Sequence, residues 1–141
     1  MNDKLELKRT LNASPARVFA AWTQTEHLLK WFAPGPMQTP VAEIDLRVGG
    51  HFRTVMQSPD GTTHEAFGVF HEVTKDERVV LTWQWRNAGS KATLLSVMIA
   101  PSGNGSELTL LHEALPSSES ATEHKKGWVG CLDKLETLLG A

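Results

Sequence analysis

The sequence predicts an α+β fold in which a curved antiparallel sheet of about seven strands wraps round a long C-terminal helix. Three observations lead to this prediction. From Ser120 to Leu139, apolar residues gather on one side of a helical projection. From Met37 to His112, the chain reads as short strands separated by turn residues. Between the first strand and this region, two short helical patterns follow one another, so helices and strands are segregated instead of alternating.

Composition indicates one globular domain spanning residues 1–141. The chain has 141 residues, of which 40% are hydrophobic, and this is enough for one core. Its formal net charge of -2 gives no sign of a nucleic-acid partner or of a basic membrane-binding surface. No run approaches the roughly 18 apolar residues of a membrane span, so we expect a cytoplasmic protein. A single cysteine, Cys131, excludes an internal disulfide and indicates a packed thiol.

The first strand is predicted at Lys4–Leu11, where leucines alternate with polar residues. Arg9 falls on the leucine face. Two readings stay open: an inward cation that serves a ligand or a buried carboxylate, or an edge residue whose head group reaches solvent.

Two short helices are predicted next. Ser14 and Pro15 favour a helix start, because serine caps free N–H groups and proline loses nothing at the first helical position. A second helix is predicted over Thr25–Phe32, and the Pro34-Gly35-Pro36 sequence ends it.

Six further strands are predicted to pair in sequence as hairpins, because the turns between them are short. The strands are Met37–Leu46, His51–Gln57, Thr63–Val73, Arg78–Trp85, Lys91–Ala100 and Ser106–His112, and the turns include Gly49-Gly50, Pro59-Asp60-Gly61 and Asn87-Ala88-Gly89.

The C-terminal helix carries one histidine, His124, within its apolar stripe. Ser120 and Glu123 read as a capping box, although Ser117 or Ser118 is an alternative start. Gly127 borders the stripe, where a missing side chain either lets another segment approach or leaves cavity volume. The stripe consists of Ala121, His124, Trp128, Cys131, Leu132, Leu135, Leu138 and Leu139.

The histidines do not form a metal-binding motif, so we expect neither a metal site nor a cofactor. His124 has two readings: a buried histidine satisfied by a backbone carbonyl or water, or a polar group that orients a ligand or exchanges a proton. His112 and Glu113 are adjacent on a strand and point to opposite faces, so they are not expected to act as an acid–base pair. No nucleophile motif or phosphate-binding loop is found, and no catalytic residue is assigned.

Tryptophan is abundant in the predicted strands and in the C-terminal helix. Trp83 and Trp85 are two residues apart and share one face of their strand. Core filling explains any single aromatic residue, whereas a wide apolar pocket would use several as walls. Arg53 would bind a ligand carboxylate if its side of the strand faces inward, and would be solvated if it faces outward.

Five motifs in a fixed order resemble bacterial SRPBCC proteins related to the C-terminal domain of the activator of heat-shock protein 90 ATPase. The resemblance covers nearly the whole chain and implies a START-like, helix-grip fold with a cavity between the sheet and the long helix. The motifs are SPARVFAAWTQTEHLLKWFAPGP, VGGHFR, GVFHEV with ERVVLTWQW, ELTLLHEALP, and HKKGWVGCLDKL.

The resemblance implies that the cavity binds a small hydrophobic molecule that is lipid-like, aromatic or polyketide-like. Two other classes stay open: an enzyme such as a cyclase, dehydratase or hydrolase that uses His124 or His112, and a stress-response interaction module that contacts a chaperone. We expect binding rather than catalysis, and a homodimer is kept as a further association. The candidate ligand-binding residues are His124, Trp128, Trp83, Trp85, Arg53, His112, Phe67 and Met98.

Overall fold

The computed structural model describes residues 3–86 and 91–140. It contains one seven-stranded antiparallel sheet in the order β1-β7-β6-β5-β4-β3-β2, so consecutive strands from β2 to β7 are neighbours and β1 joins the outer edge of β7. The predicted α+β class and meander are confirmed, and the turn expected at Asn87–Gly89 lies outside the described residues. The strands are β1 (Asp3–Leu11), β2 (Gln38–Ile44), β3 (His51–Gln57), β4 (Thr63–Thr74), β5 (Arg78–Trp85), β6 (Thr93–Ser102) and β7 (Gly105–Leu115).

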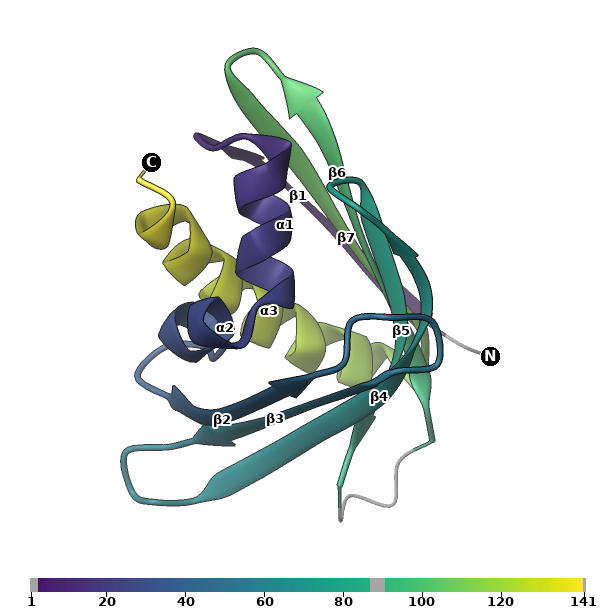
Figure 1. The fold of residues 1–141 in the computed structure, drawn as a ribbon. Coiled ribbons are helices and arrows are strands. Elements are labelled where there is room, and N and C mark those ends of the chain that lie inside the picture. The colour runs from purple at the N-terminus through teal and green to yellow at the C-terminus, as the bar shows by residue number, and fades with distance from the viewer. Residues whose placement is uncertain (1–2, 87–90, 141) are drawn as a thin grey trace.

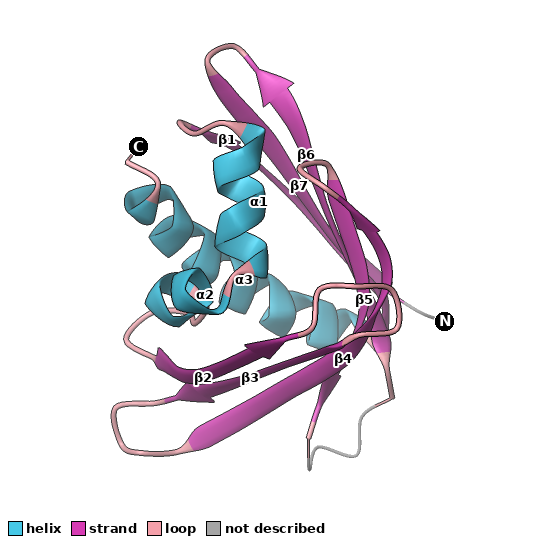
Figure 2. Ribbon diagram, in the orientation of Figure 1, coloured by secondary structure: helices cyan, strands magenta, loops and turns pink. Residues whose placement is uncertain are grey.

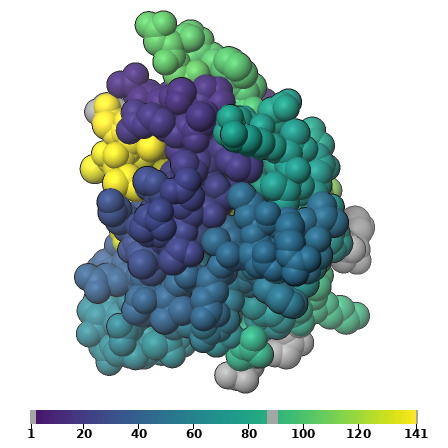
Figure 3. Space-filling model, in the orientation of Figure 1, coloured from purple at the N-terminus to yellow at the C-terminus, as the bar shows by residue number. Residues whose placement is uncertain are grey.

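The helices α1 (Pro15–Thr23), α2 (Thr25–Trp31) and α3 (Ser118–Leu138) all lie on one side of the curved sheet (Figures 1 and 2). The long helix α3 crosses the concave face, and its stripe buries Trp128, Cys131, Leu132 and Leu135. In the space-filling view, α1 and α2 cover part of the same side, and the β6–β7 hairpin projects beyond them (Figure 3). The sheet therefore has one face buried under helices and one face open to solvent.

Local sequence signals explain where the helices begin. Ser14 Oγ accepts a hydrogen bond from the backbone N–H of Arg17, and Pro15 occupies the first turn of α1. At α3 the cap is Ser117, whose Oγ accepts from the N–H of Ser120 over 3.0 Å. The alternative start was thus correct, and the capping box at Ser120 and Glu123 was not. Ser120 stands within the first turn of the helix instead.

Arg9 ties the edge strand β1 to α3. Its Nη1 atom lies 2.9 Å from Asp133 Oδ1 and 2.8 Å from Glu136 Oε1. The arginine side chain is 21% exposed, whereas that of Asp133 is 64% exposed. Arg9 is thus an edge residue whose head group reaches the surface and meets partly solvated carboxylates there.

The strand alternation decides which residues can reach the helices. On β3, Phe52, Thr54 and Met56 are buried and the residues between them are not. On β5, Val79, Leu81 and Trp83 are buried in the same way. These inward rows and α3 enclose the space described next.

Candidate functional site

A pocket of about 220 Å³ lies between β3, β5 and α3. Trp83 and Trp85 form the strand side, and the helix contributes residues from its second and third turns. The turn after α2 closes one end of the pocket. The lining residues are Pro34, Met56, Trp83, Trp85, Glu123, His124, Gly127 and Trp128.

The three tryptophans of the pocket present differently oriented rings. The ring centroids of Trp83 and Trp85 are 5.5 Å apart, with an angle of 88° between their planes. Those of Trp83 and Trp128 are 5.2 Å apart and tilted by 56°. An edge-to-face contact such as that of Trp83 and Trp85 is favourable beyond the area that it buries. The walls are therefore a rigid cluster of aromatic side chains.

His112 lies behind this wall and is 0% exposed. Trp128 Nε1–H donates to His112 Nδ1 over 3.1 Å, so Nδ1 carries no proton. His112 Nε2 lies 2.7 Å from Thr93 Oγ1, whose own proton goes to the carbonyl oxygen of Trp83. We therefore infer a neutral imidazole with its proton on Nε2, where it donates to Thr93.

Burial is the main reason why the pKa of His112 is lowered from its ordinary value to about 3, and repulsion from a proton on the neighbouring His124 would lower it further. The ring is thus neutral throughout the physiological range. Both of its nitrogens are already hydrogen-bonded, which is how buried polar groups are normally accommodated.

His124 sits at the pocket itself with the opposite tautomer. Its Nε2 accepts from Trp85 Nε1–H over 3.1 Å, and its Nδ1 lies 2.8 Å from the carbonyl oxygen of Ser120, to which Nδ1–H donates. The rings of His124 and His112 meet edge to face with centroids 4.9 Å apart. Each histidine thus accepts an indole N–H and keeps its proton on the far nitrogen.

The structure brings together four of the candidate residues at the pocket: Trp83, Trp85, His124 and Trp128. His112 is in contact with this group through Trp83 and Trp128, but it is not part of the lining. His124 has the backbone carbonyl partner that its first reading expected, but it is half-buried instead of buried. Its place in the lining also leaves it adjacent to any ligand.

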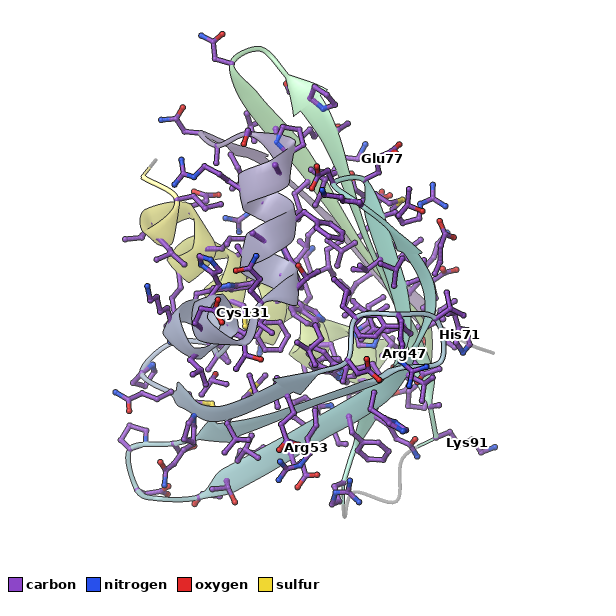
Figure 4. The ribbon with its side chains drawn as sticks, in the orientation of Figure 1. Arg47, Arg53, His71, Glu77, Lys91 and Cys131 are labelled. Atoms are coloured by element: carbon purple, nitrogen blue, oxygen red, sulfur yellow. The ribbon has the colours of Figure 1, made fainter. Side chains whose placement is uncertain are left out.

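Arg53, Phe67 and Met98 are not brought to the pocket, because strand alternation puts them on the opposite face of the sheet. Arg53 pairs there with Glu43 and Glu65, each at 3.0 Å (Figure 4). The guanidinium of Arg86 lies 4.5 Å from the ring centroid of Phe67. Met98 borders a separate surface hollow near Glu72 and Arg78.

Cys131 lies among the helices and is 2% exposed (Figure 4). Burial raises the pKa of its thiol to about 12, so the nucleophilic thiolate does not form near neutral pH. In the described ranges, no group of three His, Cys, Asp or Glu side chains is placed to hold a metal ion. Nor is any helix in those ranges long and apolar enough to cross a membrane.

Residues 12–140 match the family described as Activator of Hsp90 ATPase homolog 1-like protein. This match covers most of the chain. The chain belongs to that family.

Solved structures agree with this assignment to the Hsp90-activator-like family. A protein from Chromobacterium violaceum is 28% identical over 98% of this chain and 97% of its own, with a TM-score of 0.90. One from Nitrosomonas europaea is 29% identical over 96% and 93%, with a TM-score of 0.83. The AHSA1 protein of Silicibacter pomeroyi is 26% identical over 97% of both chains, with a TM-score of 0.87. The comparison with curated proteins gave no match.

Four lining residues of this Hsp90-activator-like chain were not among the sequence candidates: Pro34, Met56, Glu123 and Gly127. Met56 could have been found from the alternation of β3, because it shares a face with Phe52. Glu123 falls on the polar side of the helical projection, and its contact with the pocket rim has no signal in the sequence. A Cβ added at Gly127 would meet nothing within 4 Å, so the cavity reading of this glycine was correct.

Proposed function

We propose that this protein binds a small, largely apolar molecule in the pocket between the sheet and α3. The observation that carries the proposal is the lining: three indole rings, a thioether and a proline surround about 220 Å³. Apolar pockets with a few polar groups are the usual form of small-molecule sites. The family fold and the position of the pocket under the long helix are compatible with this role.

The volume supports a ligand of modest size. An engineered apolar cavity of about 150 Å³ holds benzene, and typical ligand pockets occupy about 300–1,000 Å³. A pocket of 220 Å³ thus suits a substituted aromatic ring or a short branched chain better than a long acyl chain.

The hydrogen bonds of the two histidines support binding over acid–base catalysis. A general base needs an unprotonated nitrogen within reach of the substrate. In His112 that nitrogen accepts from Trp128, and in His124 it accepts from Trp85. Either histidine would have to give up an indole partner before it could take a proton from a ligand.

Gly127 allows a direct test. Its replacement by leucine should place a branched side chain in the pocket, because a Cβ at this position meets open space. Gly127→Ala is the matched control, since it adds only a methyl group to the same helical position. Both variants should retain the circular dichroism spectrum of the native protein.

The experiment is a thermal-shift screen with small aromatic and branched aliphatic compounds, followed by calorimetry of the hits. We expect hits for the native protein and for Gly127→Ala, and at least tenfold weaker binding for Gly127→Leu. Undiminished binding by Gly127→Leu would place the ligand elsewhere. Chemical conversion of a hit, followed by mass spectrometry, would assign a reaction to the pocket instead.

A further inference from the structure

Three tryptophans line the pocket, and most of the N–H groups near it already have hydrogen-bond partners. Of its three indole N–H groups, that of Trp85 is donated to His124 and that of Trp128 to His112. The third, on Trp83, is buried and has no hydrogen-bond partner among the described residues. His124 uses its own N–H on the carbonyl oxygen of Ser120. Of these four N–H groups, only that of Trp83 is left for an acceptor on a ligand.

The lining contains one carboxylate. Glu123 lines the rim, and none of the described lining residues is a lysine or arginine. Lys126 lies 3.6 Å from Glu123, but both side chains are 72% exposed, so their pairing is weak. Arg53, which could have received a carboxylate, is on the other face of the sheet with Glu43 and Glu65. An anionic ligand would therefore lose its hydration without gaining a counter-charge.

The positive end of the α3 dipole does not reverse this preference. Ser117 caps the helix, and Glu119 provides a carboxylate in its first turn. The field of a helix end falls off within that turn. The lining residues Glu123, His124, Gly127 and Trp128 lie beyond it.

We propose that the pocket selects organic cations, namely tertiary or quaternary ammonium compounds that carry a small apolar or aromatic group. This inference rests on the proposed function, because it uses the same pocket. Cations are attracted to the faces of aromatic rings, most strongly to those of tryptophan, within about 6 Å of the centroid. Trp83, Trp85 and Trp128 line one volume with rings inclined to one another, and the Glu123 carboxylate supplies the counter-charge at the rim.

The test compares two probes of one shape. In tert-butylbenzene a quaternary carbon replaces the quaternary nitrogen of phenyltrimethylammonium, so that the two probes share one shape and differ in charge and in the hydration that the charge brings. Binding is followed by NMR through the indole N–H signals of Trp85 and Trp128, assigned with single Trp→Phe variants. A cation–π contribution of about 1.4 kcal/mol corresponds to tenfold in affinity, so we expect the cation to bind about tenfold more tightly.

Variants of the charged rim refine this test. Glu123→Gln should weaken binding of phenyltrimethylammonium about threefold and leave tert-butylbenzene unchanged. Glu119→Gln is the matched control, because it removes a carboxylate from the same helix outside the lining. Lys126→Gln should strengthen cation binding, since it removes a positive charge beside Glu123.

The outcomes separate the two proposals. Equal or tighter binding of tert-butylbenzene would overturn the preference for cations and leave the proposed apolar pocket intact. An unchanged affinity of Glu123→Gln for the cation would also overturn the preference. Failure of both probes, together with no hit in the thermal-shift screen, would overturn the proposed function itself.

Discussion

The indole Nε1–H of Trp128 donates to Nδ1 of His112 over 3.1 Å and joins α3 to β7 in the interior. His112 is 0% exposed and Trp128 is 4% exposed, so water does not compete for this hydrogen bond. On β6, Thr93 Oγ1 accepts a hydrogen bond from the other imidazole nitrogen, Nε2. One chain of polar groups therefore crosses two strands and the long helix.

Removal of the indole donor at this position should be costly. Trp128→Phe leaves His112 Nδ1 buried without a partner, which costs about 1–3 kcal/mol in addition to the lost packing volume. Urea denaturation monitored by circular dichroism measures the change in the free energy of unfolding. Trp85→Phe is the matched control, because it removes an indole donor from the half-buried His124. An equal loss in both variants would show that burial of His112 adds nothing.

The stability of the protein should decrease as the pH falls below about 6.5. The unfolded chain binds a proton at each histidine near this pH, whereas the pKa of His112 in the folded protein is lowered to about 3. The contribution of a neutral His112 is therefore fully present above pH 6.5 and declines toward pH 3, by about 1.4 kcal/mol per pH unit.

His112→Gln removes this titration. The variant can differ in stability at any one pH, so the quantity to compare is the change of the unfolding free energy with pH. Between about pH 7.5 and pH 5, the native protein should lose about 2 kcal/mol more of its unfolding free energy than the variant. This range avoids lower pH values, where Glu65, whose pKa is lowered by Arg53 and Arg86, is also protonated. Parallel pH profiles for the two proteins would contradict the assignment of the proton uptake to His112.

The two glycines of α3 should respond to alanine in opposite directions. Gly127→Ala should stabilise the protein by about 1 kcal/mol, because alanine favours the helix and its Cβ meets nothing within 4 Å. At Gly130 an added Cβ would lie 2.9 Å from Pro34 Cβ and 3.1 Å from Pro34 Cα. This overlap should outweigh the helical gain, so Gly130→Ala should lower the melting temperature. A higher melting temperature for both variants would show that the turn at Pro34 can move aside.

Sequence patterns were sufficient to predict the order of helices and strands and four of the eight residues that line the pocket. The serine and proline signals at Ser14 and Pro15 predicted the start of α1 correctly, because capping depends on neighbouring residues alone. Trp83 and Trp85 were placed on one face by a period of two, and His124 and Trp128 by a period of 3.6. Residues that are close in sequence and share a periodic face can be grouped without a structure.

Two candidate residues were assigned to the wrong face of the sheet. The alternation of a strand shows which residues share a face, but not which face points to the core, and large apolar side chains were wrongly expected to point inward. On β4 the inward residues next to Phe67 are Ala66 and Gly68, which are small, while the larger Phe67 is outside under Arg86. A Cβ at Gly68 would meet the backbone of Thr82, so only a small residue fits on that face. On β6 a continuous apolar run hides the alternation that puts Met98 outside. The hydrogen bond between Trp128 and His112 could not be predicted from the sequence either, since the two residues belong to different elements.

The two indole–imidazole hydrogen bonds fix the orientation of α3 on the sheet. Leucine side chains accept many orientations, and a helix held by them alone can rotate about its axis or slide along the groove at little cost. The bonds from Trp128 to His112 and from Trp85 to His124 are directional and form in one orientation only. Burial of the apolar stripe thus drives docking of the helix, and the two indole–imidazole hydrogen bonds stabilise one docked orientation over the others.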